Sequence, residues 1–177
     1  MSYIKRFMSK RDLKKYLSGL TKDQLEEQFI EMYDKFSEVK TYYNFVFNPK
    51  EDKLEQEAKV KISNEYFPVK SKKAKMRRSV AQKYIKHFIA LGADPYMIAD
   101  IMLFNIEIAQ SYSAERQIGY SSFYKSMLNS FKQVTDFVIA NGMAQDFKKR
   151  LKSIHDEAFV QHWENRKEFE RIYDNFE

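Results

Sequence analysis

The stretch DPYMIADIMLFNIEIAQSY, residues 94–112, decides the fold. Asp94 is a preferred N-cap residue, and Pro95 suits the first helical position, where an amide proton has no intrahelical partner. At 100° per residue the apolar side chains cover most of the helix circumference, which is typical of a buried helix. A run of about 18 residues with two acids is short for a membrane span. We therefore predict a central helix at about residues 95–112 of an all-α protein.

Three polar residues interrupt this apolar helix along one line. Asp100, Glu107 and Ser111 are spaced by seven and four residues, which places them on the same helix face. Buried carboxylates need a cation or a shared proton, because an isolated buried charge is costly. The cations available on the preceding helix are Arg77, Arg78 and Lys83. The line therefore predicts one of three things: a solvent-exposed strip, a structural ion pair, or a polar pocket with a catalytic or ligand-binding role.

Glycines and prolines divide the rest of the chain into helical segments. Gly19, Gly92, Gly119 and Gly142 fit helix ends, and Pro49 and Pro95 fit first turns. Capping-box patterns predict helix starts at Ser9 and Thr21, and the helix from Thr21 is expected to continue through the aromatic group Tyr42–Phe47. That group is interpreted as a corner of the core, and the alternative is a platform on which bases stack. Residues 144–174 form either one long helix or two with a bend near residues 156–159.

This pattern predicts one all-helical domain. We expect residues 9–174 to form a single-domain helical bundle or short superhelical stack of about seven or eight helices, preceded by an extension at residues 1–8. A length of 177 residues supports a sizeable core, and the chain contains no cysteine for a disulfide or a thiolate. No secretion signal is recognised at the start, so we expect a cytoplasmic protein.

The formal net charge of +6 is unevenly distributed. No acid occurs between Glu65 and Asp94, whereas eight cations do. These are Lys70, Lys72, Lys73, Lys75, Arg77, Arg78, Lys83 and Lys86. A second excess of cations occupies residues 1–20, so the remainder of the chain is net negative. The acid-free segment, residues 70–86, predicts a binding surface for an anionic partner such as a nucleic acid or an acidic protein.

No catalytic motif accompanies this charge. Gly119 and Gly142, the closest pair of glycines, are too far apart for a phosphate-cradling loop. His155 and His162 lack a carboxylate at metal-ligand spacing, so we expect no metal and no cofactor. His87 falls on the predicted inner face of its helix and suggests either a core histidine or a general base. A polar pocket, if present, would consist of Asp100, Glu107, Ser111 and His87.

Four segments resemble a known family. They are MSKRDLKKYL (Met8–Leu17), YNFVFNPKEDKL (Tyr43–Leu54), RRSVAQKYIKHFI (Arg77–Ile89) and FYKSMLNSF (Phe123–Phe131). From Met8 to about Phe169 the chain resembles a family of uncharacterised bacterial proteins described as a domain of unknown function. The resemblance implies a single unit and transfers no catalytic residue. It also makes Met1–Phe7 an extension or an alternative start.

Three functional hypotheses follow. The first is a non-enzymatic helical binding or scaffold protein whose basic segment engages an anionic macromolecule. The second is an enzyme or small-ligand-binding protein that uses Asp100 and Glu107 in a helix-bundle pocket. The third is an oligomeric structural module in which amphipathic C-terminal helices pair between two copies. None of them requires a membrane, and we lean towards a protein without enzymatic activity.

Overall fold

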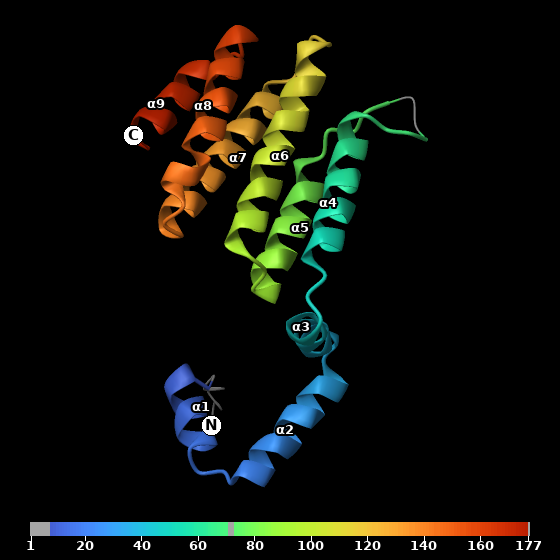
Figure 1. Ribbon diagram of the computed structural model, residues 1–177, viewed down its shortest axis with the longest axis vertical. Helices are drawn as coiled ribbons and strands as arrows, with labels where there is room; N and C mark the ends of the chain where they lie inside the picture. Colours follow the sequence, from blue (N-terminus) through green and yellow to red (C-terminus); the bar gives the residue numbers. More distant parts are fainter. Residues whose placement is uncertain (1–7, 71–72, 177) are drawn as a thin grey trace, which may run out of the picture. The chain divides into compact units, whose positions relative to one another are not determined.

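The computed structural model describes residues 8–70 and 73–176. This part of the chain is helical and contains no strand, which confirms the all-α prediction. Its nine helices are α1 (Lys10–Leu17), α2 (Lys22–Lys35), α3 (Ser37–Phe47), α4 (Glu51–Tyr66), α5 (Arg78–Leu91), α6 (Pro95–Ala114), α7 (Ser121–Ala140), α8 (Ala144–Val160) and α9 (Arg166–Asp174) (Figure 1).

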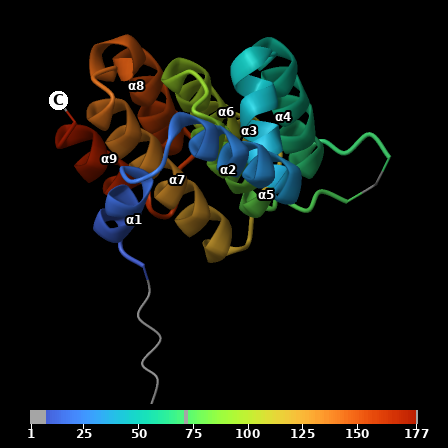
Figure 2. The ribbon, with the colours of Figure 1, turned by 90° about the horizontal axis from the view of Figure 1, so that it is seen from below.

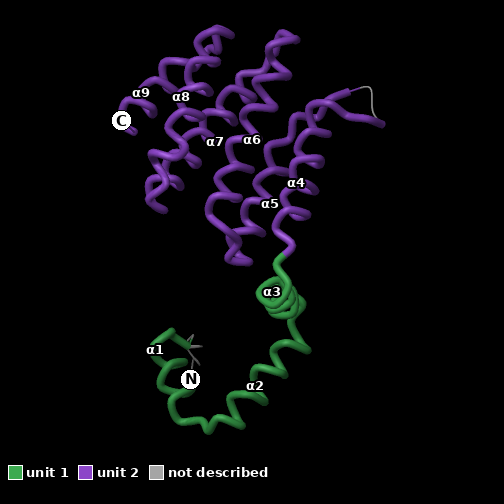
Figure 3. Tube along the Cα trace, viewed as in Figure 1, with its two compact units in different colours: residues 1–49 green, residues 50–177 purple. Residues whose placement is uncertain are grey.

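The chain forms two compact units, coloured separately in Figure 3. Unit 1 comprises Met1–Pro49 and includes α1 to α3, whereas unit 2 comprises Lys50–Glu177 and includes α4 to α9. That one domain covers residues 9–174 stays a prediction. The expected extension at residues 1–8 lies almost entirely outside the described residues.

Unit 2 is built in two layers. Helices α4, α6 and α8 pack side by side in one layer, while α5, α7 and α9 lie in the other (Figure 2). Each helix from α4 to α8 also packs against the next one along the chain, so the two layers are connected throughout. This arrangement corresponds to the predicted short stack, and α6 has neighbours on both sides in its own layer.

Helix α6 is the centre of unit 2. It begins as predicted, because an Asp94 carboxylate oxygen accepts the Tyr96 N–H at 3.0 Å and Pro95 occupies the first turn. Ten of its residues are buried, and Ile101, Leu103 and Ile106 are fully so. Removing each of these side chains from water contributes about 1.5–3 kcal/mol, as an upper estimate. The helix packs against α4, α5, α7 and α8.

Helix α5 buries a face that only partly matches the prediction, because Phe88 and Leu91 are buried but His87 is not. Its buried residues are Ala81, Ile85, Phe88 and Leu91, whereas Tyr84 is half-buried and His87 is exposed. The helix ends at Gly92 in a left-handed conformation with φ of 69°, as the sequence indicated. The Ala93 N–H then donates to the Phe88 carbonyl at 3.1 Å, which turns the chain towards α6.

The structure has more helices than the sequence suggested because two long segments are divided. Phe36 is extended, with φ of −114° and ψ of 113°, and separates α2 from α3. The C-terminal segment consists of two helices, α8 and α9. They are separated at residues 161–165, several residues after the bend that we considered, where His162 adopts a positive φ of 53°.

Unit 1 has amphipathic helices without a buried core. Both predicted capping boxes are present, at Ser9 with Asp12 and at Thr21 with Gln24. None of the described residues of this unit is buried. The aromatic group Tyr42–Phe47, interpreted as a core corner, is half-buried or exposed, and 82% of Phe47 is accessible. That interpretation was wrong, because the apolar face of α3 is only partly covered by its neighbour α2.

Candidate functional site: a basic pocket after helix α4

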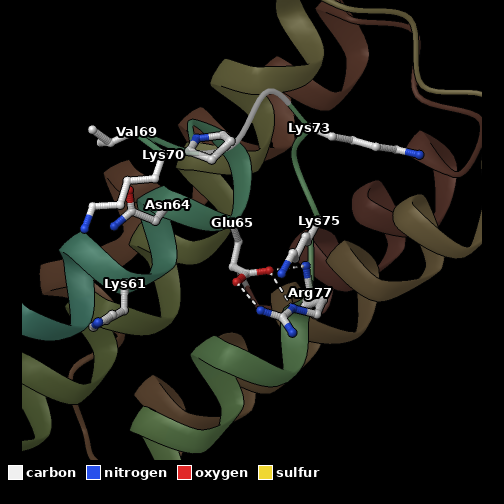
Figure 4. Close-up of a pocket in the computed structure, with 9 residues that line it drawn as sticks. Lys61, Asn64, Glu65, Val69, Lys70, Lys73, Lys75 and Arg77 are labelled. Atoms are coloured by element: carbon white, nitrogen blue, oxygen red, sulfur yellow. Dashed lines mark hydrogen bonds and ion pairs between the residues drawn. The ribbon is translucent and has the colours of Figure 1, made fainter.

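A pocket of about 340 Å³ lies where α4 ends and its connection to α5 begins. Its lining includes five cations, which are Lys61, Lys70, Lys73, Lys75 and Arg77. The other lining residues are Asn64, Glu65, Pro68 and Val69. We call this set the basic pocket (Figure 4). It gathers part of the predicted basic segment and adds residues from the last turns of α4.

Glu65 holds the connection in place. Its backbone carbonyl accepts the N–H groups of Lys75 and Met76, each at 2.9 Å. Its carboxylate accepts two hydrogen bonds from the Arg77 guanidinium, at 2.9 Å from Nε and 2.7 Å from Nη2. These bonds hold residues 75–77 against the last turn of α4, and Met76 takes a strained positive φ of 51°.

The charges around Glu65 favour its ionised form. Hydrogen bonds from Arg77 lower the pKa of the Glu65 carboxyl, and the nearby charge of Lys75 acts in the same direction. These contributions outweigh the opposing effect of burial. Glu65 is the sole acid in the pocket lining, and its carboxylate pairs with Arg77.

The lysines of the basic pocket lie on exposed positions. Lys61, Asn64 and Lys70 lie on the same side of the Glu65–Arg77 pair, whereas the Lys73 side chain extends away from them (Figure 4). Lys61, Lys70, Lys73 and Lys75 are all exposed. An anion entering the pocket would therefore meet ammonium groups together with the Asn64 amide. Lys72, which was part of the predicted binding segment, lies outside the described residues.

The remaining cations of the predicted segment are not brought to the pocket. Arg78 points instead to α7, where its Nε donates to the Ser130 hydroxyl at 2.7 Å and its Nη2 to the Gln133 amide oxygen at 2.5 Å. Burial lowers the pKa of Arg78. Lys83 and Lys86 are exposed on α5 and do not line the pocket. The acid-free segment is thus divided between a pocket, a structural arginine and a helix surface.

The polar line on α6 belongs to an ion-pair network. Asp100 pairs with Lys59 of α4 at 2.6 Å and with Arg150 of α8 at 2.5 Å. Arg150 also donates two hydrogen bonds to Glu107, at 2.9 and 2.8 Å. Burial raises the pKa of Asp100, but hydrogen bonds from Lys59 and Arg150 more than offset it and leave the pKa below its usual value. The network therefore ties together the three helices of one layer.

This network decides among the three interpretations of the line. The two carboxylates form a half-buried structural ion pair, and their cations come from α4 and α8 instead of Arg77, Arg78 or Lys83. Ser111 is exposed and donates to the Glu107 backbone carbonyl at 2.9 Å. His87 is exposed on α5, where its ring contacts Phe88, and no contact joins it to the carboxylates. The structure therefore does not bring His87 together with Asp100, Glu107 and Ser111.

Neither carboxylate lines either of the two pockets that can be compared with the predicted one. The basic pocket and a second pocket between α1 and α2 are lined by other residues. Within the described residues, no group of three or more histidine, aspartate or glutamate side chains is arranged to hold a metal ion. His155 instead stacks on Tyr173 and bonds to Asp156.

The sequence patterns did not predict roles for Lys59, Lys61, Glu65 and Arg150. A signal was available for two of them. Glu65 follows Ile62 by three positions, and Arg150 follows Phe147 by three, so each is a charged residue in phase with the apolar stripe of its helix. A charged residue in such a position must find a partner when its helix packs. Lys61 carries no comparable signal, because it is one of several exposed charges on α4.

None of the helices in the described part of the chain combines the length and the hydropathy that a bilayer span requires. In comparisons with known proteins, a family model described as "Family of unknown function (DUF6155)" matches residues 8–177. No curated protein and no solved structure matches the chain.

Proposed function

We propose that this chain, which belongs to the DUF6155 family of unknown function, is a non-enzymatic binding protein whose basic pocket engages an anionic macromolecule. The observation that carries the proposal is the composition of the pocket, in which four lysines share a lining whose one acid is paired with Arg77. Clustered lysines attract phosphate or carboxylate groups and gain affinity by releasing counterions.

Arg77 and Arg78 already bond to other side chains of the protein, which narrows the set of residues that can bind an anion. Each of the two arginines holds the fold through its own partner, since Arg77 bonds to Glu65 and Arg78 bonds to Ser130. Reversing either charge would leave Glu65 or Ser130 without its donor and would confound binding with stability. The binding role therefore belongs to Lys61, Lys70 and Lys75, which are exposed.

Charge reversal at the lysines tests the proposal. We expect the double variant Lys70→Glu/Lys75→Glu to lose most of its affinity for a fluorescently labelled polyanion, measured by anisotropy across a salt series. The matched control is Lys125→Glu/Lys132→Glu, whose lysines are exposed on α7 away from the pocket lining. Affinity that does not change with salt, or an equal loss in both double variants, would argue against a binding role for the pocket.

The polar network gives no support to an enzymatic function. Asp100 pairs with Lys59 and Arg150, Glu107 pairs with Arg150, and neither carboxylate lines the basic pocket or the pocket between α1 and α2. A general acid or base needs a carboxyl or amine group that is free to meet its substrate, whereas both of these carboxylates are paired with cations. A cytoplasmic location and a bacterial origin remain our expectations, and cell fractionation of the source organism would test the first.

A further inference from the structure

We propose that Phe67, Tyr112 and Arg116 form a stacking platform for an unpaired nucleobase, so that the partner of the basic pocket is a single-stranded nucleic acid. This inference rests on the proposed function, because it assigns a chemical class to the anion bound there. We call these three residues the stacking cluster. The sequence did not single out Arg116, and its role emerges from the geometry of the two helix ends that meet there.

The stacking cluster is a compact set of flat groups. The Arg116 guanidinium carbon lies 4.6 Å from the centre of the Tyr112 ring and 5.9 Å from that of Phe67. The two rings are 5.6 Å apart and almost perpendicular, at 76°. Arg116 keeps 48% of its side chain exposed and forms an ion pair with the adjacent Glu115. The guanidinium is thus oriented by two rings while remaining accessible to a ligand.

The cluster adjoins the basic pocket. Phe67 immediately precedes Pro68 of the pocket wall, and its N–H is fixed by the Ser63 carbonyl at 2.7 Å. The preceding residue, Tyr66, is buried and its ring contacts Tyr112 at 6.0 Å. The end of α4 therefore carries both the start of the pocket and one ring of the cluster, so a single extended ligand can contact both.

A single-stranded nucleic acid matches both features. Its phosphates suit the pocket lysines, and its bases expose flat faces that stack on aromatic rings and on arginine planes. A duplex conceals those faces within the base stack. An acidic peptide offers carboxylates to the lysines but has no general requirement for a flat guanidinium platform. The lining of the pocket and the cluster together thus favour an unpaired strand.

The same geometry predicts that the protein binds single strands of different nucleotide sequence with similar affinity. Arginine reads a base edge through two parallel hydrogen bonds, and both arginines of the basic segment already donate to protein acceptors. The lysines act as point charges towards phosphates, and stacking is available to every base. We therefore expect affinity to depend on strand length and salt more than on base order.

Anisotropy with three labelled probes tests the inference in the full chain. The probes are an oligothymidylate, a DNA duplex of the same length and a polyglutamate peptide. We expect the single strand to bind more tightly than the duplex, and its affinity to fall steeply as salt rises from about 50 mM to about 200 mM. Preferential binding of polyglutamate would overturn the inference in favour of an acidic protein partner.

Two substitutions separate stacking from charge. Arg116→Lys keeps the positive charge but removes the plane, so we expect affinity for the single strand to fall by about fivefold or more, with little change in the salt slope. Lys70→Ala removes a phosphate contact, so the slope should decrease by about 0.7. Arg171→Lys, at an exposed position in α9, is the matched control and should bind as the original chain does.

The outcomes distinguish the two proposals. The stacking inference fails if Arg116→Lys binds as tightly as the original chain and the duplex binds as tightly as the single strand. If Lys70→Ala still weakens binding in that case, the anion-binding function stands. If none of the three probes binds, the proposed function fails as well. Phe67→Leu provides a second test of the platform, and circular dichroism of each variant confirms that helicity is retained.

Discussion

At the scale of single side chains, some of the ion pairs of this protein involve charged residues that lie on the apolar faces of their helices. Arg150 lies on the same face of α8 as Phe147 and Ile154, and Glu65 lies on the same face of α4 as Ile62. Each is partly covered by packing and each is satisfied by an oppositely charged partner. Periodicity alone can flag such residues, but it cannot name their partners, because the partners lie on other helices.

Substituting Arg150 should destabilise unit 2. Arg150→Met leaves Glu107 without its cation and Asp100 with Lys59 alone. Breaking a fully buried pair costs about 3–5 kcal/mol, and the 34% exposure of Arg150 reduces this to about 1–3 kcal/mol. Urea denaturation measures the loss. The exposed control Arg171→Met should cost less than about 1 kcal/mol, and equal losses in the two variants would show that the network contributes little.

Glu65 should make stability depend on pH. Hydrogen bonds from Arg77 lower the pKa of Glu65 in the folded state, so its contribution is present above the unfolded value of about 4.3 and is lost as the pH falls through the folded value. At neutral pH, Glu65→Gln should cost about 1–3 kcal/mol, and this difference from the original chain should shrink as the pH is lowered to about 3.

Urea titrations at a series of pH values measure this effect. The control Glu170→Gln changes an exposed residue of α9 and should leave stability nearly unaffected at every pH. If Glu65→Gln lowers the free energy of unfolding by the same amount at neutral and at acidic pH, the ionised carboxylate of Glu65 is not what stabilises this part of the fold.

Helix ends are the elements that the sequence predicted best. The Asp94 N-cap, both capping boxes and the left-handed Gly92 follow from local chemistry, in which a short polar side chain or an absent Cβ satisfies the helix terminus. The break at Phe36 has no such local signal, because the apolar spacing runs through it. His87 was assigned to the inner face of α5 for a related reason, because it lies at helical spacing from the apolar residue Leu91.

Gly92 offers a test at this scale. Its φ of 69° is strained for any residue with a Cβ, even though no neighbouring atom would meet an added one. Gly92→Ala should therefore cost about 1 kcal/mol through backbone strain alone. Thermal unfolding followed by circular dichroism measures it. Gly119→Ala is the control, because open space surrounds that glycine as well and its φ is not positive; a similar loss at both positions would exclude the strain argument.

For the whole molecule, burial differs sharply between the two units. Unit 2 contains all the residues that are buried in the described part of the chain, whereas unit 1 exposes large apolar side chains. They include Ile30, Phe36 and Phe47. Short helices without a core are marginal in water. The sequence showed the amphipathic pattern of these helices, but whether a face is covered depends on the tertiary arrangement, which periodicity does not contain.

Hydrogen exchange should reveal this difference. We expect backbone amides of α1 to α3 to exchange much faster than those of α6, because local opening in unit 1 exposes little additional apolar surface. Mass spectrometry of peptides from both units measures the rates. Equal protection in α2 and α6 would contradict the expectation and would indicate that something covers unit 1 in solution.

The sequence allowed only part of the basic pocket to be predicted, for a similar reason. The acid-free run identified the basic segment, since charge composition is a property of the chain itself. Its division into a pocket, a structural arginine and a helix surface depends on Glu65, Ser130 and Gln133, which lie outside the run. The stacking cluster joins Phe67 to Tyr112 and Arg116, so only the fold brings it together.

The two-layer order of unit 2 has a consequence for folding speed. Helices that pack closely are either consecutive or separated by one helix, so native contacts close short loops and the contact order is low. We expect refolding within milliseconds. The buried Trp163 is the single tryptophan of the chain, so its fluorescence in a stopped-flow experiment reports on this step. A dominant phase lasting seconds would mean that the layers assemble by a slower, non-local route.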